Sequence, residues 1–287
     1  MEHELMDLNS QSYMETMAKL MSEALASPEG MQALAAAIAA PIEQEIKRKE
    51  ISSLLLTRHV LPKGERAIYQ KKPKVKAHWI SKEGQARQQE WGKDEVEFPT
   101  HRIHANPMVD VSVLKNGNIG TLMDLQTASA DAIRKQIDRR TLTVLSAAVP
   151  SANTIEVTTN TLEETALNEA ISIIEDMELM VKYIVMRGRR FNDMRTWNLD
   201  PQTKSELRTK GMIKNYGTGG ILLTSAAPID EILIIPNEEI GKMPVRENLK
   251  IEPIQQKTRF RTGWLVWSEL GHGVTRPDLM AKIRLGN

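Results

Sequence analysis

The chain has 287 residues, and its 41% of hydrophobic residues is enough to fill the core of one large domain or of two ordinary ones. Lysine and arginine number 38 and aspartate and glutamate 37, so the formal charge of +1 gives the chain as a whole no attraction to nucleic acid or to an anionic membrane. The absence of cysteine excludes disulfides, thiolate nucleophiles and cysteine-ligated zinc, and it suits a protein made in a reducing compartment.

Residues 13–50 are predicted to form helices with an apolar face rich in methionine and alanine. The start of the chain lacks the basic and apolar regions of a signal peptide, and no apolar run is long enough to span a membrane, so we expect neither. Ser27 is the expected N-cap of a helix with Pro28 at its first position, and Pro41 is expected to break or restart that helix. Because such a face is soft and adaptable, we expect this arm to pack on a neighbouring chain. A helical hairpin folded on its own domain is the alternative.

A short apolar segment at 51–61 is expected to be buried, and residues 62–99 then alternate as the two strands of an extended hairpin. A two-stranded hairpin is marginal by itself in water, so we expect it to need a partner surface. Its charges divide into a basic half and an acidic half, which are candidate contacts between subunits: Lys71, Lys72, Lys74, Lys76, then Glu90, Asp94, Glu95, Glu97. The alternatives are a nucleic-acid site that combines the lysines with Tyr69 and Trp79, and a solvated loop.

Residues 101–114 alternate as a strand, Asn116 and Gly117 form a turn, and residues 119–149 are predicted to be one long helix that Pro150 ends. The apolar stripe of that helix is narrow, and its small residues allow a sheet or a second helix to come close. His101 and His104 fall on opposite faces of the strand, so we expect no metal site there.

After Pro150 the pattern alternates between strands and helices. Strands are predicted at 155–159, 179–186, 220–224, 231–235, 249–254 and 263–269, and the last segment, from 277, is predicted as a helix or a strand. Thr161 and Glu164 have the spacing of a capping box, and Asp200 begins a further helix. Arg187, Arg189 and Arg190 lie in a predicted turn, where we expect a surface contact to acidic residues of another subunit; a phosphate site is the alternative.

Catalytic motifs are missing. The glycine cluster at 216–220 lacks the lysine of a phosphate loop and does not fit a dinucleotide fingerprint, and no nucleophile elbow, H-E-x-x-H, kinase or EF-hand pattern occurs. We therefore assign no catalytic, cofactor-binding or metal-binding residue.

The order of these pieces resembles the major capsid proteins of tailed bacteriophages, which have the Hong Kong 97 fold. The resemblance covers almost the whole chain. It is most specific in the C-terminal third, in three segments: ILLTSAAPIDEILIIP, IGKMPVRENLKIEP and WLVWSELGHGVTRPDLMAKI. The second contains Arg246, Leu249 and Ile251 in an R-x-x-L-x-I arrangement similar to that of the family.

This resemblance implies an α+β fold of named parts. They are an N-terminal arm (1–50), the start of the peripheral domain (51–61), a hairpin called the E-loop (62–99), the peripheral domain (100–152) with its spine helix (119–149), the axial domain (153–244), and return strands of the peripheral and axial domains (245–287).

The resemblance also implies a structural function, so we expect that the protein is not an enzyme. Copies assemble as hexamers and pentamers into an icosahedral shell around the phage genome, by way of a procapsid built in the host cytoplasm. The implied partners are the chain itself, a portal, a separate scaffolding protein, an optional decoration protein, and packaged double-stranded DNA held by weak non-specific contacts. No cofactor, metal or membrane is implied. The alternatives are an encapsulin-type compartment that encloses cargo enzymes and a monomeric α/β enzyme.

Overall fold

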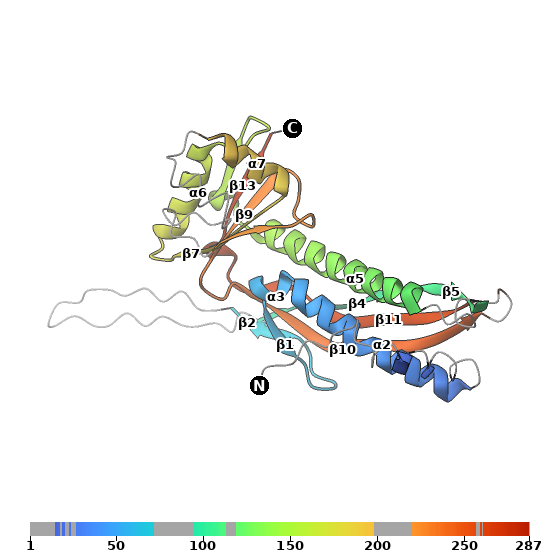
Figure 1. Cartoon of the computed structure of the whole chain (residues 1–287). Coiled ribbons are helices and arrows are strands. Elements are labelled where there is room, and N and C mark those ends of the chain that lie inside the picture. Colours follow the sequence, from blue (N-terminus) through green and yellow to red (C-terminus); the bar gives the residue numbers. More distant parts are fainter. Residues whose placement is uncertain are drawn as a thin grey trace, which may run out of the picture. The chain divides into compact units, whose positions relative to one another are not determined.

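The structure is a computed structural model that describes residues 15–17, 19–20, 23, 27–71, 95–112, 119–197, 220–256, 259 and 261–286 (Figure 1). The chain divides into two compact units. Unit 1 comprises Met1–Leu54, Thr100–Thr143 and Val245–Gly271, and unit 2 comprises Leu55–Pro99, Val144–Pro244 and His272–Asn287. Within the described residues, no helix has the length and apolar character needed to cross a membrane.

Helix α2 (Pro28–Lys49) begins as predicted. The Gly30 N–H donates a 3.0 Å hydrogen bond to Ser27 Oγ, and a proline occupies the first turn, where its missing N–H costs nothing. The predicted break at Pro41 is wrong, because the helix continues through it to Lys49. Burial of the apolar residues on either side of Pro41 supplies the stabilisation that offsets the lost backbone hydrogen bond.

The apolar face of α2 is buried on its own unit. Ile38 and Ile42 line a cavity of about 10 Å³ together with Leu125, Trp264 and other residues of unit 1, so the packing there is tight. The face comprises six buried residues: Met31, Leu34, Ala35, Ile38, Ile42 and Ile46. The expectation that this segment packs on a neighbouring chain is therefore wrong for 28–49. The alternative, a helical hairpin folded on its own domain, agrees with the structure for α2, while most of the residues before Ser27 lie outside the described residues.

Helix α5 (Ile119–Ala148) confirms the predicted long helix. Ala130, Ile133 and Ile137 of the predicted stripe are at most 5% exposed, and Leu142 and Leu145 extend the buried face. Unit 1 also contains the start of α3 (Ser52–Leu55), which follows α2 directly. Figure 1 shows α2 and α5 lying along the long strands of this unit.

The sheet of unit 1 is built on the long antiparallel pair β10 (Gly241–Gln256) and β11 (Arg261–Gly271), of which β10 begins in unit 2. Strands β4 (Thr100–Ala105) and β5 (Met108–Asp110) both pair with β11. The single strand predicted at 101–114 is therefore two strands, interrupted at 106–107 because Pro107 has no N–H to donate. The predicted turn at Asn116 and Gly117 lies outside the described residues.

Unit 2 is organised around a five-stranded sheet in the order β6-β13-β9-β7-β8. The strands are β6 (Thr154–Val157), β13 (Ala281–Leu285), β9 (Glu231–Pro236), β7 (Val181–Met186) and β8 (Ile221–Leu223). Four of them confirm the strands predicted at 155–159, 179–186, 220–224 and 231–235. The last segment is a strand preceded by a single turn, η4 (Pro277–Leu279), and η1 (Ser151–Asn153) precedes β6.

Helices α6 (Glu164–Glu175) and α7 (Gly188–Thr196) pack on this sheet, where Leu167, Ile174 and Met194 are fully buried. The predicted capping box is wrong, since the N-cap of α6 is Glu163 rather than Thr161. The predicted basic turn is also wrong in its extent, because α7 already begins at Gly188. The helix predicted from Asp200 and the glycine cluster up to 219 lie outside the described residues.

The predicted hairpin has an ordered base in unit 2. Strands β2 (Ile68–Gln70) and β3 (Glu95–Glu97) pair antiparallel, with Ile68 opposite Glu97 and Gln70 opposite Glu95. Residues 72–94 lie outside the described residues. The remaining strands of unit 2 are β1 (Thr57–Val60), whose four residues are all exposed, and β12 (Gly273–Val274), which pairs with the first residues of β10.

Candidate assembly interfaces

The base of the hairpin is anchored by an aromatic cluster. Tyr69 and Phe98 stack with their ring centroids 5.1 Å apart, and the Tyr69 hydroxyl is hydrogen-bonded to His59 Nδ1 at 2.8 Å. Burial, followed by the charge of Glu65, raises the pKa of Tyr69 above 10.0, so the hydroxyl stays protonated at neutral pH. The Lys242 ammonium lies 5.4 Å from the Tyr69 ring centroid, within cation–π range. The two strands therefore leave the unit from a fixed point.

Exposed apolar side chains accompany this anchor. Val60 is 58% exposed and Ile68 is 43% exposed, although both are large aliphatic residues on strands. Successive side chains of a strand point to opposite faces, and Tyr69 of β2 is buried. Ile68 therefore faces away from the cluster that holds the hairpin base. A single exposed aliphatic residue needs no explanation, but two on neighbouring segments suit a surface that another subunit covers.

Of the charged candidates in the hairpin, the structure describes three. Lys71, Glu95 and Glu97 are exposed, and Lys71 directly follows the Gln70–Glu95 pair, so the first lysine of the basic half lies beside the described part of the acidic half. Within the described part of the chain, none of the three forms an ion pair. The other candidates lie outside the described residues: Lys72, Lys74, Lys76, Glu90 and Asp94.

The three arginines at the end of β7 have different environments. Arg190 is 1% exposed, and its guanidinium donates to Asn160 O at 2.6 Å, Ile229 O at 3.0 Å and Asp230 Oδ1 at 2.8 Å. The Asp193 carboxylate lies 3.5 Å from Arg190 as well. Every one of these partners belongs to the same unit, so the expected surface contact does not extend to Arg190, which joins three loops internally.

Arg187 and Arg189 border a surface pocket of about 340 Å³. Arg187 Nε donates to Ala227 O at 2.5 Å, and Arg189 is exposed. The remaining lining residues are Gly188, Leu223, Thr224, Ser225 and Ile229. Sequence reasoning identified the arginines but missed the apolar part of this pocket, because only the fold brings the 223–229 turn beside the start of α7.

The sequence pattern also gave no indication of a buried polar cluster in unit 2. Lys282 is 5% exposed, and its Nζ donates to Ser146 O at 3.1 Å and lies 3.5 Å from Glu231 Oε1, while Ser146 Oγ donates to Glu231 Oε2. The three groups satisfy one another, which suits a structural brace between α5, β9 and β13. No group of three or more metal-ligating side chains occurs among the residues that the structure describes.

No protein-family model matches the chain, and no curated protein is similar to it in sequence. Its fold does match solved structures. One from Microbacterium phage Oxtober96 has a TM-score of 0.65 at 11% identity and covers 82% of this chain and 91% of that chain. The capsid of the cyanophage P-SCSP1u has a TM-score of 0.58 at 13% identity, covering 81% and 87% respectively. A virus-like particle from Pyrococcus furiosus has a TM-score of 0.58 at 12% identity, covering 86% and 98%.

Proposed function

We propose that this chain, which has the Hong Kong 97-like fold of those shells, is a major capsid protein. In this proposal, copies assemble as hexamers and pentamers into an icosahedral shell that encloses phage DNA in the virion. The observation that carries the proposal is the extent of the fold similarity, since the phage structures cover at least 81% of this chain and it covers at least 87% of them.

The parts of the chain take the corresponding roles in this proposal. Residues 62–99 form the E-loop, 119–149 the spine helix, and 153–244 most of the axial domain. The aromatic anchor at the hairpin base and the exposed Val60 and Ile68 support a hairpin that lies on a neighbouring subunit. We propose the hairpin charges from Lys71 to Glu97, together with Arg187 and Arg189, as contacts between subunits.

The role is proposed to be structural rather than catalytic. Ser146, Glu231 and Lys282 bring a hydroxyl, a carboxylate and an amine together in unit 2, and these groups are buried and bond to one another. Portal and scaffolding proteins are the further partners we propose. Packaged DNA would be held only weakly, which agrees with a formal charge of +1.

An encapsulin-type compartment is the second candidate. It is supported by the match to the Pyrococcus furiosus virus-like particle, of which this chain covers 98%. The genes beside this one distinguish the two candidates, because a phage capsid gene is expected near terminase and portal genes, and a compartment gene near that of a cargo enzyme.

The experiment that tests the proposal is to purify the full chain, alone and with a scaffolding protein, and to examine it by sedimentation velocity and negative-stain microscopy. We expect capsomers or closed particles. A chain that stays monomeric across protein concentration, salt and crowding agent would overturn both shell readings and favour the monomeric enzyme.

A further inference from the structure

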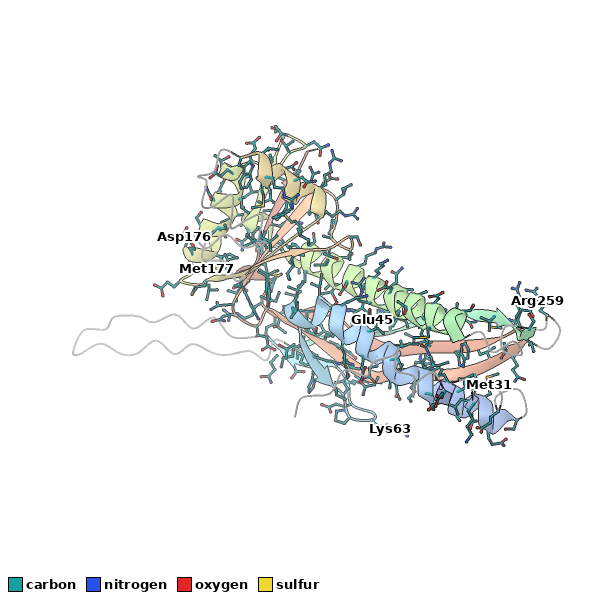
Figure 2. The ribbon with its side chains drawn as sticks, viewed as in Figure 1. Met31, Glu45, Lys63, Asp176, Met177 and Arg259 are labelled. Atoms are coloured by element: carbon teal, nitrogen blue, oxygen red, sulfur yellow. The ribbon has the colours of Figure 1, made fainter. Side chains whose placement is uncertain are left out.

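The turn that joins α6 to β7 carries negative charge, which is unfavourable at the C-terminal end of α6. Glu175, Asp176 and Glu178 are exposed acidic residues at the C-terminal end of α6, and the last turn of that helix contains no basic residue. The C-terminal end of a helix is the negative end of its dipole, so these carboxylates destabilise the helix that they follow. Figure 2 shows Asp176 together with Met177 at this end of α6.

The backbone of the same turn is also unfavourable for the residue it holds. Glu178 has a φ of +61°, its N–H donates to Glu175 O at 2.8 Å, and the Leu179 N–H donates to Ile174 O at 3.3 Å. This is the Schellman pattern that ends many helices, and the position of Glu178 in it is ordinarily taken by glycine. The chain thus keeps a carboxylate where glycine would give a more stable subunit.

An exposed apolar side chain completes the turn. Met180 is 63% exposed, the highest value among the large hydrophobic residues that the structure describes. Its backbone is fixed, because Met180 O accepts a 2.9 Å hydrogen bond from the Asn237 N–H. We call residues 175–180 the acidic knob, since a flexible thioether whose backbone is held at a fixed point, in a turn that also contains three exposed carboxylates, suits insertion into a pocket.

The other end of β7 leads into α7, and the start of this helix carries positive charge, which is unfavourable beside the positive end of its dipole. Arg187 and Arg189 flank the N-terminus of α7, the positive end of its dipole, and the first turn of α7 contains no acidic residue. No side chain caps this helix, and a Cβ placed on Gly188 would meet nothing within 4 Å, so the first residue of the helix borders open space. The nearby carboxylates of Asp193 and Asp230 are engaged by Arg190.

The pocket beside this helix end has an apolar part that matches the knob. Leu223 is 46% exposed and Ile229 is 44% exposed, and both line the pocket of about 340 Å³ with the two arginines. Leu223 is held in place by parallel pairing of β8 with β7, where it lies opposite Met186. We call this the basic pocket. It offers aliphatic surface and positive charge, and the acidic knob offers a thioether and negative charge.

The two features cannot meet within one subunit. They lie at opposite ends of the six-residue strand β7, a separation of about 20 Å at the rise of a β-strand. We propose that the acidic knob of one copy docks in the basic pocket of the next copy, with Met180 against Leu223 and Ile229 and with the Asp176 and Glu178 carboxylates facing Arg187, Arg189 and the uncapped N-terminus of α7. This contact is head-to-tail, and repeated contacts of that kind close into a ring when the rotation from one copy to the next closes, as the hexamers and pentamers of the proposed function require. The inference rests on the proposed function and names the contact that closes its capsomers.

Disulfide trapping tests the pairing directly, because the chain contains no cysteine. In Met180→Cys/Leu223→Cys, a bond within one chain is excluded, since a disulfide requires Cα atoms within about 7 Å of each other. Oxidation of the assembled double variant is expected to give a ladder of linked chains up to the size of a capsomer. Each single variant is expected to give no ladder, and a mixture of the two is expected to give linked pairs.

Charge variants test the same contact in solution. Arg189→Glu is expected to abolish capsomer formation, and adding Glu178→Arg to it is expected to restore assembly. The control is Glu169→Lys, which changes the charge by the same amount and in the same direction as Glu178→Arg, at an exposed position in the middle of α6, and it is expected to assemble normally. Glu178→Gly is the sharpest variant, because it is expected to raise the melting temperature of the unassembled subunit while weakening assembly.

The outcomes separate this contact from the shell proposal. If the wild-type chain forms shells, but the double cysteine variant gives no ladder and Arg189→Glu assembles normally at low and physiological salt, the contact is overturned and the proposed function stands. Loss of stability in Glu178→Gly would also overturn it, since the carboxylate would then serve its own subunit. A wild-type chain that never assembles overturns the proposed function and the contact with it.

Discussion

Asp138 of α5 accepts hydrogen bonds from Ser52, through Oγ at 2.7 Å and the backbone N–H at 3.1 Å. The Ile51 N–H donates to the same carboxylate oxygen at 3.1 Å. One buried side chain, 1% exposed, thus takes up the free donors at the start of α3, which a local N-cap residue would otherwise satisfy. Arg134 lies 3.5 Å from the other oxygen and balances its charge.

Replacing Asp138 with alanine should therefore leave three donors without an acceptor in a buried site. We expect a loss of about 1 to 3 kcal/mol in the free energy of unfolding, measured on the unassembled subunit by urea denaturation. Asp124→Ala, at an exposed position of the same helix, is the control and should change stability by no more than about 0.5 kcal/mol. Equal effects of the two substitutions would contradict a capping role for Asp138.

Glu269 should make the stability of unit 1 depend on acid pH. Burial raises its pKa, but hydrogen bonds from Arg102 and Thr100 and the charges of Arg102 and Arg246 outweigh burial and lower the pKa below 4.5. A lowered pKa means that the stabilisation is complete above the ordinary value and is lost as the pH falls through the lowered one. We expect Glu269→Gln to reduce the melting temperature at neutral pH and to have progressively less effect as the pH falls through the lowered pKa, where the wild-type carboxylate also becomes protonated. A difference that stays constant as the pH falls would show that the charge is not responsible.

The parts of the fold that local patterns determine were predictable. The helix over 119–149 follows from the spacing of Ala130, Ile133 and Ile137, and Ser27 followed by a proline identified the start of α2. Period-two alternation of Val181, Tyr183 and Val185 located β7, and a short run of apolar residues located β9, which is buried along almost its whole length. These features need no information from distant residues.

The errors arose where a distant part of the chain decides the outcome. Pro41 would break an isolated helix, but packing of the surrounding face on unit 1 holds α2 together. Thr161 has the spacing of a cap, yet the adjacent Leu162 N–H donates to Asp193 Oδ2 at 3.1 Å, and the helix begins two residues later. Arg190 looks like its exposed neighbour Arg189 in sequence and is buried only because distant loops surround it. The basic pocket could not be predicted for the same reason.

Gly273 should be intolerant of any side chain, because a Cβ there would lie 2.2 Å from the ring of Phe98. Phe98 belongs to the aromatic cluster at the hairpin base, so Gly273→Ala must displace that ring. We expect a loss of about 1 to 3 kcal/mol in unfolding free energy and faster proteolysis of the hairpin. Gly188→Ala is the matched control, since its Cβ would meet nothing within 4 Å. If both variants melt at the wild-type temperature, the ring is not held as the structure places it.

The lysines of the hairpin should act on assembly rather than on folding. Exposed ion pairs contribute only about 0 to 1 kcal/mol each, but symmetry repeats the same contact around every capsomer. We expect Lys71, Lys72, Lys74 and Lys76 changed together to glutamate to block assembly or to make it strongly salt-dependent, with little change in the melting temperature of the subunit. Light scattering during assembly at two salt concentrations measures this effect.

Three exposed basic residues of α5 provide the control for that variant: Lys135, Arg139 and Arg140. Changing them to glutamate introduces a similar shift in net charge without touching the hairpin. Normal empty shells from the hairpin variant at both salt concentrations would rule out the intersubunit role. A defect limited to genome filling would indicate instead that these lysines contact nucleic acid.

Truncation of the N-terminal segment separates α2 from the residues that precede it. Because Ile38 and Ile42 pack beside Leu125 and Trp264, and because Arg134 Nη1 donates to Lys49 O at 3.4 Å, α2 is part of the core of unit 1. Removing residues 1–26 leaves the Ser27 cap intact and should preserve a cooperative thermal transition. Removing residues 1–50 should abolish it, since the apolar face of α5 would then be exposed to water. If the variant that lacks residues 1–50 still unfolds cooperatively, α2 is not needed for the core, and the whole segment would instead be an arm that packs on a neighbouring chain.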